Sequence, residues 1–201
     1  MNYGFIKVAS AIPSVKVGDV KYNTAQIENL IAQAEGQGVE VIVFPELSVT
    51  GYSCQDLFRQ DILLDSAETA VMVLLDFTRK LNIITIVGVP IVAGDILLNC
   101  AVVIQQGEIL GIVPKTYLPN YNEFYERRWF ASSSDLCHDE IRFAGHKLLM
   151  PLKSTIFTTS QGVRFGVEIC EDVWAPIPPS NNLTLAGADI IFNMSASDEL
   201  I

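Results

Sequence analysis

The stretch Gly-Val-Glu-Ile-Cys-Glu-Asp-Val-Trp, residues 166–174, changes character at its centre. Up to Ile169, apolar residues alternate with small or polar ones, which is the pattern of a half-buried strand. The alternation stops at Cys170, and the thiol is surrounded by three carboxylates, Glu168, Glu171 and Asp172. Because α/β folds display active-site groups at the carboxyl ends of strands, Cys170 is a candidate nucleophile. A structural cysteine at the end of a buried strand is the alternative interpretation.

Length and composition favour one globular domain over residues 1–201. Half of the residues are hydrophobic and 18% are charged, which indicates a substantial core and a sheet covered on both faces. The formal net charge of −10 argues against nucleic acid or a membrane surface as a partner. No apolar stretch approaches the ~20 residues of a membrane-spanning helix. Small molecules and other proteins remain as partners.

The four cysteines, Cys54, Cys100, Cys137 and Cys170, form no Cys-x-x-Cys pair, so the sequence predicts no metal cluster. We interpret the adjacent Cys137-His138 pair, with His146 beyond it, as part of a solvated loop rather than a metal site. Unclustered thiols in a chain that begins without an export signal predict a reducing, cytoplasmic location.

The order of the expected elements predicts an α/β fold. Periodicity predicts strands over 5–12, 39–44 and 83–89, with helices over 23–37 and 66–81 between them. Two antiparallel hairpins are expected next, over 97–113 with a turn at Gln106-Gly107, and over 155–169. A short helix over 181–187 and a buried strand over 189–193 close the chain. Antiparallel pairs between α/β passages favour a layered sandwich, and the abrupt end at Ile201 resembles a truncation inside a domain.

Three ionisable residues follow predicted strands. Glu46 follows a strand and Pro45, Lys115 follows the first hairpin, and Cys170 follows the second. A thiol with an ordinary pKa near ~8.5 is a poor nucleophile at neutral pH unless a base takes its proton or a cation stabilises the thiolate. A carboxylate and an ammonium beside it would supply both functions, and the ammonium could also stabilise an oxyanion. Each residue taken alone could equally be a solvated or structural side chain.

Three strings carry a family resemblance: FPELSVTGYSCQDLF at 44–58, PKTYLPNYNEFYERRWF at 114–130 and EICEDVWAP at 168–176. They resemble the catalytic motifs of the nitrilase, or carbon–nitrogen hydrolase, superfamily, and within it the glutaminase domains of bacterial glutamine-dependent NAD⁺ synthetases. The resemblance covers essentially the whole chain. It implies a four-layer α–β–β–α sandwich and a catalytic Glu, Lys and Cys at Glu46, Lys115 and Cys170.

The resemblance also implies a reaction and a substrate site. Glu46 would take the proton of Cys170, and the thiolate would attack the side-chain amide of glutamine. Lys115 and the backbone N–H after the cysteine would stabilise the oxyanion. A second family glutamate matches Glu123, which would orient Lys115 or the substrate amide. The implied contacts to glutamine are Tyr121, Phe124, Glu171 and Ser197. For Tyr121 and Phe124, ordinary aromatic packing within a loop is the alternative interpretation.

The same resemblance defines what the chain lacks. A synthetase domain with its phosphate-binding loop, ATP and Mg²⁺ is absent from this sequence, and the glutaminase step itself implies no cofactor. The family implies a C-terminal synthetase domain as partner and assembly as a homo-oligomer. Two other functions stay open at this point: a stand-alone amidase or carbamoylase of the superfamily, and a non-catalytic assembly module. Sequence beyond Ile201 would distinguish the first of these from the glutaminase.

Overall fold

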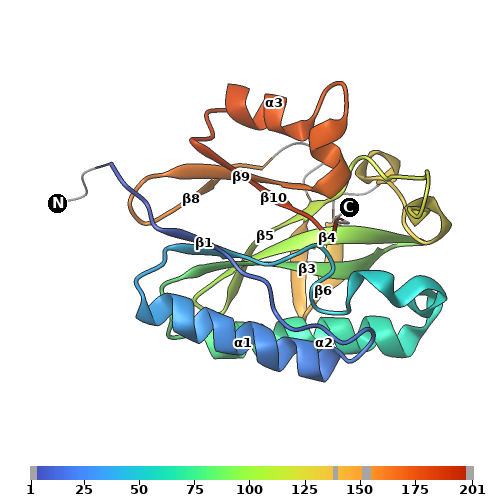
Figure 1. Cartoon of the computed structure of the whole chain (residues 1–201), viewed down its shortest axis with the longest axis horizontal. Coiled ribbons are helices and arrows are strands. Elements are labelled where there is room, and N and C mark those ends of the chain that lie inside the picture. Colours follow the sequence, from blue (N-terminus) through green and yellow to red (C-terminus); the bar gives the residue numbers. More distant parts are fainter. Residues whose placement is uncertain (1–3, 138–139, 151–154, 198–201) are drawn as a thin grey trace.

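The computed structural model describes residues 4–137, 140–150 and 155–197, which are arranged in four layers (Figure 1). Helices α1 (Val20–Gly36) and α2 (Asp61–Thr78) form the first layer, against a five-stranded sheet. A three-stranded sheet lies on the other face of that sheet, and α3 (Pro179–Leu185) covers it. The predicted α–β–β–α sandwich is therefore confirmed.

The larger sheet has five strands in the order β1-β2-β3-β4-β5. Its first three strands are parallel to one another, and β3, β4 and β5 pair antiparallel. The predicted hairpin is β4 with β5, and its turn residues Gln106 and Gly107 both have positive φ, as a two-residue hairpin turn with the favoured twist requires. The strand bounds are β1 (Val8–Ser10), β2 (Val41–Val43), β3 (Ile84–Ala93), β4 (Ile96–Gln105) and β5 (Glu108–Pro114).

The smaller sheet places β9 (Arg164–Ile169) between β8 (Phe157–Thr158) and β10 (Ile190–Met194). The β8–β9 pair is the second predicted hairpin, and β10 runs parallel to β9. Four 3₁₀ segments lie between the strands and helices of the described residues: η1 (Tyr52–Arg59), η2 (Glu126–Arg128), η3 (Ser133–Asp135) and η4 (Cys170–Trp174). Cys170 thus stands at the junction of a central strand and a tight turn.

A separate hairpin was not predicted. Strands β6 (Glu140–Phe143) and β7 (His146–Leu149) pair antiparallel across Ala144 and Gly145, both with positive φ. Cys137 is exposed just before it, and His138 lies outside the described residues. Helix α2 begins at Asp61, earlier than expected, and strand β1 pairs only over its central part.

Two apolar cores explain why the central strands are continuously hydrophobic. On β3, Val87 and Val89 pack towards the helices, whereas Ile84 and Ile86 pack towards the smaller sheet. Burial on both faces is what a nearly uninterrupted apolar run predicts. Among the described residues, no helix is long and apolar enough to span a membrane.

Candidate active site

The carboxyl ends of three strands carry the residues that the sequence singles out. Glu46 follows β2, Lys115 follows β5 directly, and Cys170 follows β9 directly. All three are buried, with exposed fractions of 2%, 0% and 7%. A buried glutamate and a buried lysine are uncommon unless they are paired, so their partners define the site.

A glycine in β3 allows Glu46 to reach the interior. A Cβ at Gly88 would collide with the backbone of Pro45, Glu46 and Leu47. Leu47 has a positive φ of 51°, which turns the chain immediately after Glu46. The Glu46 loop is also tied to β3 by a hydrogen bond from Gly88 N–H to Ser48 Oγ at 3.2 Å. The backbone of Pro45–Leu47 therefore lies directly against β3 at Gly88, and this close approach directs the carboxylate of Glu46 into the interior.

The ammonium of Lys115 lies between two carboxylates. Its Nζ is 2.6 Å from Oε1 of Glu46 and 2.7 and 2.9 Å from the two oxygens of Glu126. Burial alone would lower the pKa of Lys115, but the charges of Glu46 and Glu126 outweigh it and raise that pKa above its ordinary value. Lys115 is consequently a permanent cation at neutral pH.

Two further side chains complete this cluster. Asn99, buried in β4, donates from Nδ2 to Oε1 of Glu46 at 2.6 Å. Tyr52, in η1, donates its hydroxyl hydrogen to Oε1 of Glu126 at 2.7 Å. The cluster thus comprises Tyr52, Glu126, Lys115, Glu46 and Asn99, which come from separate strand ends and turns of the chain.

The position of Glu126 corrects one sequence-based expectation. We expected Glu123 to orient Lys115, but Glu123 is exposed, and it is Glu126 that contacts the ammonium with both oxygens. The reason is local geometry: after Lys115 the chain runs through Pro119 and bends so that Glu126 N–H bonds to Pro119 O, and η2 then returns the chain towards the site. The other role expected of Glu123, at the substrate amide, stays a prediction.

Burial and charge set the protonation of the carboxylates. Burial, followed by the negative charge of Glu46, raises the pKa of Glu126 to about 7, although Lys115 and Tyr52 oppose the shift. Glu126 therefore takes up a proton more readily near neutrality than an ordinary glutamate does. Burial, with the charge of Glu126, raises the pKa of Tyr52, so its hydroxyl remains a donor.

Cys170 has a strained backbone and a protonated side chain. Its φ is +46°, in the left-handed region that a side chain with a Cβ rarely adopts. Burial and the charge of Glu46 raise the pKa of the thiol, while Lys115 and hydrogen bonding with Ser197 and Ser195 counteract the increase. The sulfur lies 3.7 Å from Oγ of Ser197. At rest the group is a thiol, and attack on a carbonyl requires a base.

The expected substrate residues lie in different surroundings. Tyr121 donates its hydroxyl hydrogen to Oε2 of Glu171 at 2.8 Å, beside the cysteine. Phe124 is half-buried and packs edge-on against both Tyr121 and Tyr52, at centroid distances of 6.1 and 6.3 Å. Phe124 thus adjoins the cluster through Tyr52, whereas Tyr121, Glu171 and Ser197 lie on the side of Cys170. Their contacts to glutamine stay predictions.

The other two carboxylates near Cys170 bind backbone amides. Glu168 accepts Ser180 N–H at 3.0 Å, at the start of α3, and lies 3.4 Å from Nδ2 of Asn193. Asp172 accepts the backbone N–H groups of Thr116, Tyr117 and Ile169. In the described part of the chain, no group of three or more His, Cys, Asp or Glu side chains is arranged to hold a metal ion.

Sequence reasoning missed Glu126, Asn99 and Tyr52. Asn99 carries a usable signal, because it is a polar residue in the middle of the apolar run Ile96–Gln105 and a buried polar side chain requires a partner. Glu126 and Tyr52 carry none, since each meets the cluster through an irregular turn whose path no periodicity describes.

The fold agrees with a comparison to known families. Residues 7–199 match the family model described as carbon-nitrogen hydrolase, and the chain belongs to this family. The family consists of enzymes that act on carbon–nitrogen bonds, and the chain is therefore a carbon–nitrogen hydrolase.

Within this family, the chain is similar to glutamine-dependent NAD⁺ synthetases. The glutamine-dependent NAD(+) synthetase of Mycobacterium leprae is 38% identical over 202 residues, covering 98% of this chain and 29% of the relative. The solved structure of glutamine-dependent NAD+ synthetase from Acinetobacter baumannii in complex with ADP is 30% identical, with a TM-score of 0.82, over 98% of this chain and 33% of that chain. An amidase of Nesterenkonia shares the fold, with a TM-score of 0.77 at 19% identity over 96% of this chain and 67% of that chain. The chain thus spans less than a third of the length of its synthetase relatives.

Proposed function

We propose that the chain is a glutaminase, the part of a glutamine-dependent NAD⁺ synthetase that releases ammonia from glutamine. The observation that carries the proposal is the buried ammonium of Lys115, held between Glu46 and Glu126, with the buried thiol of Cys170 within reach of the charges of Glu46 and Lys115. Similarity to glutamine-dependent NAD⁺ synthetases over 98% of the chain supports glutamine as the substrate.

The first half of the proposed reaction forms a thioester. Glu46 accepts the proton of the Cys170 thiol, and the sulfur attacks the side-chain amide carbon of glutamine. The carbonyl oxygen becomes an oxyanion, for which Lys115 and the backbone N–H of Glu171 are the donors. The amide nitrogen takes the proton from Glu46 as the carbon–nitrogen bond breaks, and ammonia leaves.

The second half restores the enzyme. Glu46, again a carboxylate, takes a proton from water while the water oxygen attacks the thioester carbon. The carbon–sulfur bond breaks, glutamate is released, and the sulfur regains a proton. Glu46 suits this double role because Oε1 already accepts from Lys115 and Asn99, whereas Oε2 is buried without a partner among the described residues.

The mouth of the site suits an amino acid. A carboxylate such as Glu171 is the natural partner of an α-ammonium group, and Tyr121 already fixes its orientation. The ring of Phe124 offers an apolar wall for the two methylenes of glutamine. Ser197, beside the sulfur, completes the proposed set of substrate contacts.

The wider protein follows from the synthetase relatives. We infer a synthetase domain on the C-terminal side of residues 1–201, which uses ATP and Mg²⁺ to amidate nicotinic acid adenine dinucleotide with the released ammonia, a ligase reaction. The glutaminase step needs no cofactor of its own. We also infer that the assembly is a cytoplasmic homo-oligomer.

One experiment separates this function from that of a general amidase. Ammonia release from L-glutamine, D-glutamine and acetamide is measured with the intact protein, and labelling by 6-diazo-5-oxo-L-norleucine is located by peptide mass spectrometry. We expect a strong preference for L-glutamine, label on Cys170, and loss of both in Cys170→Ala but not in the exposed-cysteine control Cys137→Ala.

The same variants test whether ammonia release and NAD⁺ synthesis take place at separate sites. Cys170→Ala should abolish NAD⁺ synthesis from glutamine and leave synthesis from free ammonia nearly intact. Hydrolysis of acetamide at least as efficient as that of glutamine would instead indicate an amidase. Label on Cys54 or Cys100 with none on Cys170 would refute the assigned nucleophile, and failure to hydrolyse any amide would favour an assembly module.

A further inference from the structure

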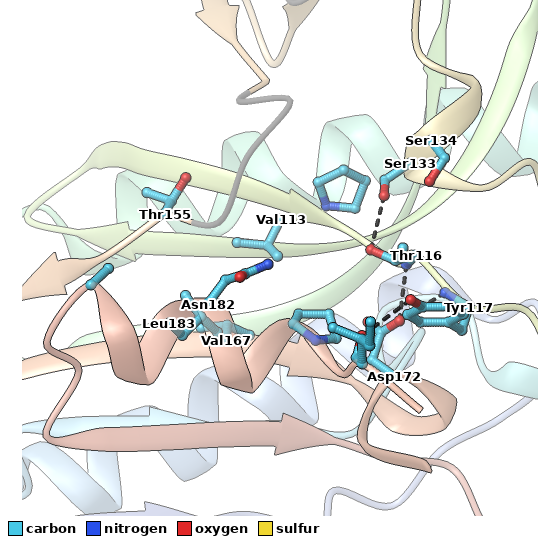
Figure 2. Close-up of a pocket in the computed structure, with 14 residues that line it drawn as sticks. Val113, Thr116, Tyr117, Ser133, Ser134, Thr155, Val167, Asp172, Asn182 and Leu183 are labelled. Carbon is cyan, nitrogen blue, oxygen red and sulfur yellow. Dashed lines mark hydrogen bonds between the residues drawn. The ribbon is translucent and has the colours of Figure 1, made fainter. Parts of the chain in front are cut away.

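Asp172 uses both of its carboxylate oxygens to bind backbone amides from two parts of the chain. Oδ1 accepts the N–H groups of Thr116 and Tyr117, at 3.1 and 2.8 Å, and Oδ2 accepts that of Ile169 at 3.0 Å. Figure 2 shows the side chain of Asp172 pointing at the segment that contains Thr116 and Tyr117. The exposed fraction of Asp172 is 1%, so these amides replace water as its partners.

The three amides adjoin the two residues that the reaction must bring together. Thr116 and Tyr117 directly follow Lys115, and Ile169 directly precedes Cys170. The two segments leave strands of different sheets, β5 and β9. No ladder of backbone hydrogen bonds joins different sheets, and Asp172 supplies a hydrogen-bonded connection between these two strand ends in addition to the apolar packing of the sheets.

The outer side of this connection is not packed tightly. Thr116, Tyr117 and Asp172 form part of the wall of a pocket of about 540 Å³ that extends to Leu183 of α3 (Figure 2). Tight packing normally fixes neighbouring segments in a protein interior. Because a pocket borders this connection, the two segments depend more on the hydrogen bonds of Asp172, and less on packing, for their relative position.

The strain at Cys170 adds to the need for restraint. A non-glycine residue in the left-handed region is strained and persists only where the surroundings hold it. Asp172 holds the N–H of Ile169 on one side of Cys170, and Nδ2 of Asn193 donates to the Cys170 carbonyl at 3.3 Å on the other. The nucleophile is thus held through the backbone at both ends.

We propose that Asp172 is a positioning residue that fixes the thiol of Cys170 relative to the ammonium of Lys115. The inference rests on the proposed function for the roles of Cys170 and Lys115. Asp172 does not touch substrate. It acts by holding two backbone segments in register, so that the thiolate forms beside its cation and the oxyanion forms between its donors.

The test uses a graded pair of variants in the intact protein. Asp172→Asn keeps an oxygen for Thr116 and Tyr117 but places an amide donor against Ile169 N–H, whereas Asp172→Ala removes all three acceptor contacts. We expect kcat for glutamine to fall about 10-fold to 100-fold in Asp172→Asn and further in Asp172→Ala, with KM within about 3-fold of the wild type. Glu35→Gln is the matched control, because Glu35 also accepts two backbone amides, those of Asn82 and Ile83, far from the site.

A second readout does not depend on glutamine. The rate of alkylation of Cys170 by iodoacetamide is measured at one pH in all four proteins by peptide mass spectrometry. We expect the rate to follow the order wild type, Asp172→Asn, Asp172→Ala, from fast to slow, with Glu35→Gln equal to the wild type. If the wild type hydrolyses no glutamine, the proposed function fails and the alkylation series alone decides the role of Asp172.

Equal kcat and equal alkylation rates in the folded Asp172 variants and the wild type would overturn the proposal. So would a rise in KM that accounts for the whole loss of kcat/KM. If neither variant folds, amide hydrogen exchange in the wild-type protein, measured by NMR, tests whether Asp172 holds these backbone amides. Slow exchange of Thr116, Tyr117 and Ile169 relative to Tyr121 supports the connection, and exchange of Thr116 and Tyr117 at the rate of Tyr121 refutes it.

Discussion

The side-chain amide of Asn99 donates a 2.6 Å hydrogen bond to the same oxygen of Glu46, Oε1, that Lys115 contacts at 2.6 Å. The two donors occupy one oxygen of the carboxylate. The other oxygen, Oε2, is buried and has no partner in the described part of the chain. The carboxylate is therefore oriented, with its uncommitted oxygen available to accept a proton.

Replacing Asn99 with leucine should impair this orientation without removing any charge. A hydrogen bond to a charged group contributes ~1.5–3 kcal/mol, so we expect kcat for glutamine hydrolysis to fall about 10-fold to 100-fold. Steady-state kinetics measure the fall in kcat, and a thermal melt establishes that the variant is folded. Asn82→Ala, at the opposite end of the sheet, is the control and should retain activity. Unchanged kcat in a folded Asn99→Leu protein would show that Lys115 alone orients Glu46.

Glu126 and Glu123 form a pair of test positions in the same loop. Glu126 contacts Lys115 with both oxygens, whereas Glu123 is exposed. We expect Glu126→Gln to lower kcat at least about 100-fold, because a strong contact to a buried cation is lost. Glu123→Gln should leave kcat within about 3-fold. A rise in KM in Glu123→Gln would place that residue at the substrate amide, and a large loss of kcat there would contradict the assignment of Glu126.

Removing the buried cation should cost stability as well as activity. In Lys115→Met, Glu46 and Glu126 remain as two adjacent buried carboxylates, and loss of one partner of a buried ion pair costs ~3–5 kcal/mol. Chemical denaturation should show this loss, and adding Glu126→Gln should recover part of it. The double variant should remain inactive, since no cation is restored. Full stability of Lys115→Met would show that the two carboxylates take up a proton instead at little cost.

The sequence predicts those parts of the fold and the site that depend on local pattern. The apolar run of β3 and the turn at Gln106-Gly107 reflect burial and backbone conformation within a few residues, and both were predicted correctly. The hairpin β6–β7 was missed because each strand has only four residues, too few to establish a period, and β7 is largely exposed. The positions of Glu46, Lys115 and Cys170 after strands were also predictable, since such ends are where α/β sheets gather functional groups.

What the sequence could not predict depends on contacts between distant segments. Glu123 and Glu126 are both acidic and both follow Lys115, and only the course of the chain after Pro119 determines which one reaches the ammonium. Asp172 likewise carried no assignment until its amide partners at Thr116 and Ile169 were known. Side chains that act through the backbone of another segment leave no signature in composition or spacing.

Stability should decrease as the pH rises from about 5 to 8. Burial raises the pKa of Glu126 from 4.5 to about 7 and that of Asp172 from 3.8 to about 6. A group with a raised pKa in the folded state contributes stability that is complete below its unfolded pKa and is lost as the pH rises through its folded pKa. Each unit of pKa shift corresponds to ~1.4 kcal/mol, so a loss of at least ~1 kcal/mol is expected over this range.

Urea denaturation at pH 5, 6, 7 and 8 measures this slope, and Glu126→Gln and Asp172→Asn should each flatten it over the range in which the replaced group titrates. Asp56, whose pKa is lowered by hydrogen bonds from Arg128 and Trp129, acts in the opposite direction only below its ordinary value of 3.8, outside the window. A free energy of unfolding that stays constant or rises from pH 5 to 8 would mean that the folded protein keeps both carboxyl groups ionised. The ion pairs of Lys115 and the backbone amides at Asp172 would then outweigh the cost of burial.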